Sequence, residues 1–364
     1  MDVELLSKFS GILDAPSCYP EKKRKSRDQR LEDLTYWYDK YNDINEVYNL
    51  WGMDCVDAGN LDEWLDRGLF RKQRHDINAF VYPNGSRFPM DYTVVMRDKR
   101  MFEAFCEMVL GDTGSYSPSL AYIIEGQFFL KNAGFNASAD FTDFICGYES
   151  EMLVFKQVFG CSGETVKVVR IENGTIISGG RLLSPSEFLA QLTDCRLSNW
   201  IVQKYIVQHP DMMKLNETSV NTLRFVTYHT GDSVTLYPVI MMRYGLPGAL
   251  VDNSSLGVGV DINGIVMESA FDLKSKSRLQ CHAAGMSVPY FKEAIEMVKH
   301  LHSQIPEIFT VGWDICIKPE GPHVIEGNDG WDVVLHQAFS GCKMRNFWNE
   351  MVRRHESYYG LDKK

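Results

Sequence analysis

Residues 311–328, VGWDICIKPEGPHVIEGN, contain the pattern that most constrains the fold. Two apolar runs flank the segment KPEGP at 318–322, and its proline and glycine residues are typical of a tight turn. The stretch therefore predicts an antiparallel hairpin with strands at 311–317 and 323–328.

Three side chains with oxygen ligands interrupt this apolar hairpin. Glu326 and Asn328 are two residues apart and so share one face of their strand. The turn centres near Glu320, which places Asp314 opposite Glu326. Carboxylate and amide oxygens are ligands that Mg²⁺ prefers. The spacing predicts a metal site, although it is equally typical of the solvated face of an edge hairpin.

The chain before this hairpin has the same pattern of apolar runs and turn residues. Short apolar runs separated by turn residues predict further hairpins, and runs of helical period lie between them. Hairpins are expected at 166–180, 222–243 and 257–271, and helices at 98–111, 289–301 and 334–356. Antiparallel hairpins with helices between them favour an α+β fold over a doubly wound parallel sheet.

The helix expected at 98–111 has a defined apolar spacing. Met101, Phe105 and Met108 lie at i, i+4 and i+7, and Gly111 can end the helix. This spacing predicts that these three side chains share one face.

Composition excludes several classes of protein. The 364 residues are 45% hydrophobic, which is too high for a disordered chain. A net charge of −10 argues against broad nucleic-acid binding. No apolar stretch is long enough to span a membrane. The acidic N-terminus does not read as a secretion signal, and nine cysteines without a CxxC pair favour a reducing cytoplasm.

One basic run stands out near the start of the chain. Residues 21–30 hold six basic and two acidic residues, and the aromatic-rich run 31–51 follows them. The pattern is typical of a solvated helix start that leads into a packed helix. A surface for an acidic partner or a membrane is the alternative.

A candidate phosphate-binding site combines a lysine with a loop of small residues. Lys156 lies in the predicted strand 152–157, and the loop 160–163 follows it. Backbone N–H groups of such a loop and a lysine ammonium can meet phosphate oxygens from two sides. No Gly-Lys-Ser/Thr follows, so this is not a Walker A motif.

A candidate anion-binding group lies in the hairpin at 222–243. Asn221 and Arg224 are three residues apart at the entry of one strand, and Arg243 ends the partner strand. Two arginines near one end of a hairpin suit an anionic substrate or a transferring phosphoryl group. Surface ion pairing is the alternative.

The order of these motifs resembles that of the ATP-grasp superfamily. A strand with a lysine (LVFKQ), a glycine loop, a strand leading to a hinge (IVQKYI) and Asp-x₁₁-Glu-x-Asn follow one another. The stretches QKYIVQHPDM, SVNTLRFVTY and VGWDICIKPEGPHVIEGN are similar to the sugar-transfer-associated ATP-grasp proteins of bacterial polysaccharide gene clusters. The resemblance covers about residues 95–345.

The resemblance implies two α+β subdomains that grip ATP, here 95–205 and 206–364, with a helical or mixed N-terminal domain over 1–94. It implies Mg²⁺ at Asp314, Glu326 and Asn328, and catalytic roles for Arg224 and Arg243 at the γ-phosphate or an acyl intermediate. The residues implied for the nucleotide are Lys99, Lys156, Gly160, Ser162, Gly163, Gln203, Lys204, Tyr205, Ile206 and Asn221.

Four positions depart from the pattern of relatives, and one of them is Gln157, which replaces the proline that often follows the strand lysine. Lys204 stands where many relatives have an acidic hinge residue. Gly312 stands two residues before Asp314, where amino-acid ligases of this fold often have an arginine. Stabilisation of an oxyanion is then expected from the two arginines of the hairpin. Asn253 lies in a glycine-containing region that looks shorter than its equivalent, and is a further candidate site residue.

The resemblance implies an ATP-dependent carboxylate–amine ligase that forms an acyl phosphate and acts on a polysaccharide or sugar precursor. Its expected partners are ATP, a small carboxylate and an amine, with no nucleic acid. A phosphotransferase acting on a hydroxyl group and a non-catalytic nucleotide-binding protein are the alternatives.

Overall fold

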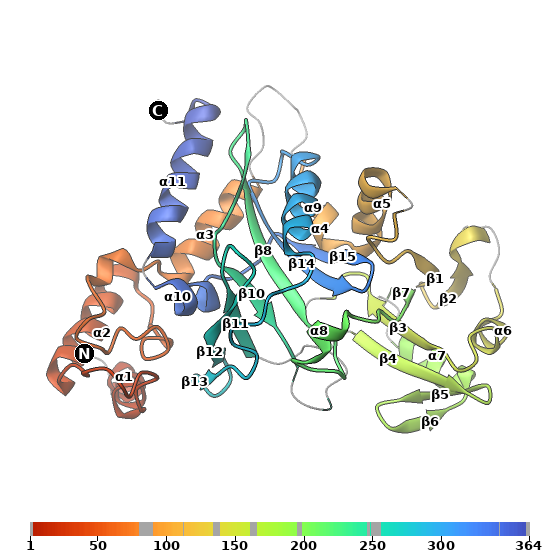
Figure 1. Cartoon of the computed structure of the whole chain (residues 1–364), viewed down its shortest axis with the longest axis horizontal. Helices are drawn as coiled ribbons and strands as arrows, with labels where there is room; N and C mark the ends of the chain where they lie inside the picture. The colour runs from red at the N-terminus through yellow and green to blue at the C-terminus, as the bar shows by residue number, and fades with distance from the viewer. Residues whose placement is uncertain are drawn as a thin grey trace.

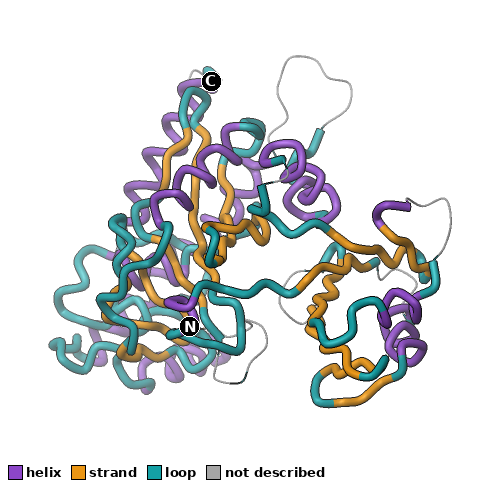
Figure 2. The backbone as a smooth tube through the Cα atoms, turned by 45° about the vertical axis from the view of Figure 1, so that its right-hand side comes forward, coloured by secondary structure: helices purple, strands orange, loops and turns teal. Residues whose placement is uncertain are grey.

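The computed structural model describes residues 3–79, 90–111, 113–133, 139–160, 166–194, 199–245, 248, 256–341 and 343–361. These residues form two lobes, each built on an antiparallel sheet, and extended segments run between the lobes (Figure 2). N-terminal and C-terminal helices cover one side of the larger lobe (Figure 1). Mixed helices and antiparallel sheets confirm the predicted α+β class.

The smaller lobe holds a seven-stranded sheet in the order β2-β1-β7-β3-β4-β5-β6. Helices α6 (Phe141–Cys146) and α7 (Pro185–Thr193) pack on it with a core that includes Phe155 and Phe188. Asn173 and Gly174 both have positive φ, which fits the tight turn between β4 and β5. The strands are β1 (Ser119–Ile124), β2 (Gln127–Leu130), β3 (Met152–Gln157), β4 (Val166–Glu172), β5 (Thr175–Ser178), β6 (Arg181–Leu183) and β7 (Trp200–Lys204).

The larger lobe holds an eight-stranded sheet in the order β13-β12-β11-β10-β8-β14-β15, with β9 paired to β8. The hairpin predicted at 311–328 is β14 and β15, and Asp314 lies opposite Glu326 as expected. The strands are β8 (Thr222–His229), β9 (Val234–Leu236), β10 (Ile240–Arg243), β11 (Leu256–Val260), β12 (Val266–Asp272), β13 (Ser277–Gln280), β14 (Thr310–Lys318) and β15 (Gly321–Asn328).

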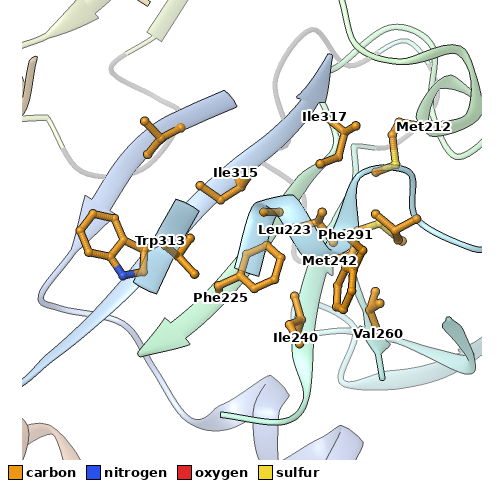
Figure 3. Close-up of a cluster of buried hydrophobic side chains, with 14 of the residues drawn as sticks. Met212, Leu223, Phe225, Ile240, Met242, Val260, Phe291, Trp313, Ile315 and Ile317 are labelled. Carbon is orange, nitrogen blue, oxygen red and sulfur yellow. The ribbon is translucent and has the colours of Figure 1, made fainter. Parts of the chain in front are cut away.

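One face of this sheet packs on helices α4 (Val94–Arg97), α5 (Lys99–Leu110) and α9 (Phe291–Ser303). Trp313, Ile315 and Ile317 of β14 gather there with Leu223 and Phe225 of β8 (Figure 3). We call this cluster, which also includes Ile240, Met242, Val260 and Phe291, the apolar core. The short helix α8 (Pro210–Met213) adds Met212 to it.

The N-terminal helices pack on the other side of the larger lobe. Trp37 and Trp51 share a core with Phe271 of β12 and Val334 of α10, and the Trp51 indole donates a 2.9 Å hydrogen bond to the Val334 carbonyl. These helices are α1 (Val3–Asp14), α2 (Arg27–Tyr41) and α3 (Arg67–Asn78), with the short turns η1 (Leu61–Glu63) and, in the smaller lobe, η2 (Lys131–Ala133).

Two helix predictions are corrected. Helix α5 is capped by Asp98 and ends at Gly111, but Met101 and Met108 are exposed. Phe105 is buried with Phe102 and Cys106, so the inward face is rotated from the predicted one. The apolar residues of α5 are spread around the helix, so more than one face could pack inward. The face that contacts the sheet is the one with Phe102, Phe105 and Cys106.

The single helix predicted at 334–356 is two helices. The chain forms α10 (Val334–Ser340) and α11 (Lys343–Tyr358). Gly341 lies between them at φ 65°, a left-handed conformation that ends a helix and favours glycine.

Residues of the basic run have partners within the N-terminal region. Lys22, Arg24 and Lys25 form ion pairs with Asp57, Asp54 and Asp33, respectively. Ser26 caps α2 through a capping box with Gln29. This arrangement agrees with a helix start rather than a free basic surface. Among the described residues, no helix is long and apolar enough to cross a membrane.

Candidate functional site

Strand alternation separates two sets of side chains on the larger sheet. Trp313 and Ile315 point into the apolar core, so Asp314 between them points to the opposite face. Register places Arg224 of β8 opposite Asp314 on one side and Glu326 on the other. We call the group on this face the charged patch, and its members are Arg224, Arg243, Asp314, Glu326 and Asn328.

Asp314 is the centre of the charged patch. Its side chain is 1% exposed and lies between two guanidinium groups. Arg224 contacts both carboxylate oxygens, through Nε to Oδ1 and through Nη2 to Oδ2 at 2.6 Å. Arg243 donates from Nη2 to Oδ2 at 2.8 Å. Two arginines therefore compensate one buried carboxylate, and with Glu326 the charged patch holds two positive and two negative side chains.

The arginines keep Asp314 ionised. Burial alone would raise the pKa of this carboxyl, but the charges of Arg224 and Arg243 and the hydrogen bond from Arg224 outweigh burial and lower the pKa. The carboxylate is therefore the form present at neutral pH.

Gly312 makes room for the Arg224 side chain. A Cβ atom at residue 312 would lie 2.9 Å from Arg224 Cδ and 2.8 Å from the Cβ of Trp331. Any larger side chain at 312 would need the same space. Arg224 can therefore adopt its observed conformation only when residue 312 is glycine. Arg224 of the neighbouring strand therefore occupies the space beside Gly312.

Glu326 and Asn328 complete a set of donors for a hard cation. Asn328 Nδ2 lies 3.2 Å from Glu326 Oε1 and 3.5 Å from Asp314 Oδ2, so the three side chains converge. Within the described residues, no group of three His, Cys, Asp or Glu side chains forms a metal cluster. The set is two carboxylates and one amide, which fits Mg²⁺ once the amide turns its oxygen toward the carboxylates.

A pocket lies where the two lobes meet. Lys99 of α5, Lys156 of β3, Gln203 of β7 and Ile206 line it, and all four were predicted to contact a nucleotide. Ile325, the residue before Glu326, lines it from the larger sheet. Ile325 is the link in sequence between the pocket and the charged patch, whose own residues do not line the pocket.

Hydrogen bonds hold the two ends of this pocket. Lys99 Nζ donates to the Gly160 carbonyl at 2.6 Å, which places Gly160 beside this lysine. The Gln203 amide donates to the Ser117 carbonyl at 2.7 Å, and Gln203 is buried. The side chain of Gln203 is therefore hydrogen-bonded within the pocket wall, to Ser117.

Two predicted nucleotide residues point elsewhere. Lys204 follows Gln203 in the strand and so faces the opposite side, where it forms a 3.2 Å ion pair with Glu151. Asn221 is fully buried, and its amide donates to Gln208, Met212 and Asn216. The geometry gives Asn221 a role in holding the segment 208–221.

The remaining predicted residues have mixed outcomes. Tyr205 is partly buried just before Ile206, and its N–H donates to the Met152 carbonyl at 3.2 Å. Burial raises the pKa of its phenol. Ser162, Gly163 and Asn253 lie outside the described residues.

Sequence reasoning missed part of the pocket wall. Tyr116 and Ser117 line it, and the Ser117 hydroxyl is 2.8 Å from His323 Nε2 on β15. Burial, with the nearby charges of Lys318 and Lys156, lowers the pKa of His323 to about 4, although its bond to the Gly114 carbonyl acts in the opposite direction. No sequence motif marked Tyr116 or Ser117.

The solved structures similar to this chain share little sequence with it. The sequence matches none of the curated proteins. D-alanine–D-alanine ligase from Bacillus anthracis aligns with a TM-score of 0.39 and 12% identity, over 72% of this chain and 70% of that chain. D-alanyl-alanine synthetase A from Vibrio cholerae gives 0.44 and 9%, over 73% of this chain and 66% of that chain.

N5-carboxyaminoimidazole synthetase from Staphylococcus aureus, complexed with ADP, aligns with a TM-score of 0.37 and 12% identity, over 65% of this chain. The alignment spans 45% of that synthetase, less than half of its length. A family model described as sugar-transfer associated ATP-grasp matches residues 85–350, which is well over half of the chain. The fold is therefore the ATP-grasp fold, and the chain belongs to the sugar-transfer associated ATP-grasp family.

Proposed function

We propose that the protein is an ATP-dependent carboxylate–amine ligase that forms an acyl phosphate. The observation that carries the proposal is that Ile325, which lines the pocket with Lys99 and Lys156, directly precedes Glu326 of the charged patch in β15. The pocket supplies cations that suit phosphates, and the patch supplies donors that suit Mg²⁺ and two arginines. The proposal places the nucleotide base between the lobes and its γ-phosphate at the charged patch.

The pocket residues divide the work of binding. Ile201, Ile206 and Ile325 supply apolar surface for a base, and the ammonium groups of Lys99 and Lys156 meet phosphate oxygens. Arrival of a phosphate would release Lys99 from the Gly160 carbonyl, because the ammonium would exchange a neutral acceptor for a charged one.

Asp314, Glu326 and Asn328 would hold Mg²⁺. When bound, the ion would neutralise charge on the phosphate oxygens. Arg224 and Arg243 donate to Asp314 and so lie beside the three proposed ligands. There the two guanidinium groups would stabilise the charge that develops on the transferring phosphoryl group.

The chemistry follows from positioning. A carboxylate oxygen of the substrate bonds to the γ-phosphorus as the bond to ADP breaks, and the electron pair leaves with ADP. The nitrogen of an amine then bonds to the acyl carbon, phosphate leaves with the electrons of its C–O bond, and the ammonium loses a proton to solvent. The described residues hold the reactants in line and keep water out.

The family description supports a sugar-linked carboxylate or amine as a substrate, in the making of a polysaccharide precursor. We place the reaction in the cytoplasm, where ATP is available.

The test is ADP release from Mg²⁺-ATP against a panel of carboxylic acids, with and without amines, and with hydroxylamine as a trap. Release that depends on an acid and yields a hydroxamate is the expected result. ADP with a phosphorylated hydroxyl compound and no hydroxamate would replace the ligase with a phosphotransferase. ATP binding with no ADP release under any acceptor would identify a non-catalytic nucleotide-binding protein.

A further inference from the structure

The segment after Asn328 is held by residues from the N-terminal part of the chain. Asn328 is the last residue of β15, and its pairing with Gly312 is the end of the β14–β15 ladder among the described residues. Beyond this pair, backbone ladder bonds no longer fix the chain. The position of the Asn328 side chain then depends on what holds residues 329–332.

Arginine side chains hold both carboxylates of that segment. Arg97 of α4 contacts Asp329 Oδ2 through Nε at 3.1 Å and Nη2 at 2.6 Å. Arg67 and Arg71 of α3 contact Asp332 Oδ2 through Nε at 2.9 and 3.0 Å. The side chain of Asp329 is 13% exposed, so its pair with Arg97 is largely shielded from solvent on the acidic side.

Buried groups of α3 hold the backbone of the same segment. Arg74 Nη1 donates to the Trp331 carbonyl, and Asn78 donates to the Asp329 carbonyl at 3.3 Å. Asn78 also exchanges two 3.0 Å hydrogen bonds with Thr310 at the start of β14. Both residues are at most 9% exposed. Helix α3 therefore ties the start of β14 to the segment that follows the end of β15.

We propose that Arg97 and the arginines of α3 are positioning residues for Asn328 at the cation site. The inference rests on the proposed function, because the cation site is part of it. The N-terminal region then contributes to metal binding without supplying a ligand. Groups that orient a metal ligand affect metal affinity although they never touch the ion.

If Arg97 acted only through its charge, its removal would have the opposite effect on metal affinity from the one that a positioning role predicts. A guanidinium near a divalent cation repels it, so removing the charge would strengthen metal binding if Arg97 acted only through its field. A positioning role predicts weaker binding. The sign of the effect therefore separates the two.

The experiment is calorimetric titration of ADP into the full chain, once with excess Mg²⁺ and once with EDTA. Arg97→Gln is expected to weaken ADP binding about tenfold with Mg²⁺ and to leave it unchanged in EDTA. Arg97→Lys, which keeps one donor and the charge, is expected to recover part of the loss. The matched control is Lys72→Gln on α3, because Lys72 pairs with Asp76 on an exposed surface.

An equal loss in both buffers, no loss, or tighter binding with Mg²⁺ would overturn the inference. Arg71→Gln tests the second anchor and replaces Arg97→Gln if that variant does not fold. A native chain whose ADP affinity ignores Mg²⁺ would instead contradict the proposed function. If Mg²⁺ raises the ADP affinity of the native chain and of Arg97→Gln by the same factor, only the positioning role is contradicted.

Discussion

The apolar core and the charged patch lie on opposite faces of the same strands, yet they differ in almost every physical respect. Trp313 and Asp314 are neighbours in β14, and both are at most 1% exposed. Trp313 gains stability from burial and packing. Asp314 must recover the cost of burial from two arginines. The degree of burial therefore does not separate the structural residue from the candidate site residue. The two differ in that the buried charge of Asp314 needs two arginine partners, whereas Trp313 needs none.

The sharpest way to break this comparison is Trp313→Ala. We expect the free energy of unfolding to fall by about 4 kcal/mol, because a fully buried indole leaves a cavity against Phe102 and His302. Urea unfolding measures the loss. ADP release per folded molecule should change less than tenfold, and a larger drop would show that the two faces are not separable.

Arg224→Met removes one charge from the other face and keeps an apolar stem. We expect ADP release to fall about 100-fold, equivalent to about 2.7 kcal/mol, because a donor to developing phosphate charge is lost. The matched control is Arg170→Gln, since Arg170 pairs with Glu172 on the exposed side of the smaller sheet. Equal ADP release in the two variants would contradict the catalytic role of Arg224.

Gly312→Ala tests the space beneath Arg224. The added methyl group would meet Arg224 and Trp331, and we expect a loss of about 2 kcal/mol in the free energy of unfolding. Thermal unfolding and ADP release are measured together. Because the methyl group displaces the Arg224 stem, activity should fall with stability. Full activity in a destabilised variant would show that the guanidinium tolerates another path.

The pH dependence of stability compares one buried histidine from each face. His302 bonds to Thr227 beside the apolar core, and His336 lies near Arg224. Burial lowers the pKa of His302 to about 3 and of His336 to about 4, below the usual value near 6.5. Between pH 6.5 and 4 the unfolded chain binds protons that the folded chain does not.

The free energy of unfolding should therefore fall as the pH falls through this window, by about 1.4 kcal/mol per pH unit for each histidine. Urea unfolding at pH 7, 6 and 5 measures the slope. His302→Gln and His336→Gln should each reduce it. A slope that stays the same in either variant would remove that histidine from the explanation.

Local patterns predicted the parts of the site that lie close in sequence. The register of Asp314 with Glu326 follows from one turn and the two-residue period of strands. The contacts of Arg224 and Arg243 with Asp314 depend on β8 lying between β10 and β14, and this order is set by pairing between distant segments. No local pattern contains that information.

The prediction for residues 203–206 was too broad, because it did not take the alternation of side chains along a strand into account. Gln203 and Lys204 were assigned to one site, but successive residues of a strand face opposite ways. Only Gln203 lines the pocket. The family pattern names a segment, and strand geometry decides which of its side chains take part.

The packing of α5 has a mechanical consequence. Its buried apolar residues belong to the apolar core of the larger lobe, whereas Lys99 and the buried Glu103 are bonded to the smaller lobe. The Lys99 N–H donates to the Val158 carbonyl at 3.1 Å and the Lys99 ammonium to the Gly160 carbonyl at 2.6 Å. Helix α5 therefore acts as a tie rod between the lobes. Glu103 of α5 also accepts hydrogen bonds from the Ser119 N–H at 2.8 Å and the Lys131 ammonium at 2.6 Å. Any motion that parts the lobes must break these bonds or carry β1 and the end of β3 with the helix.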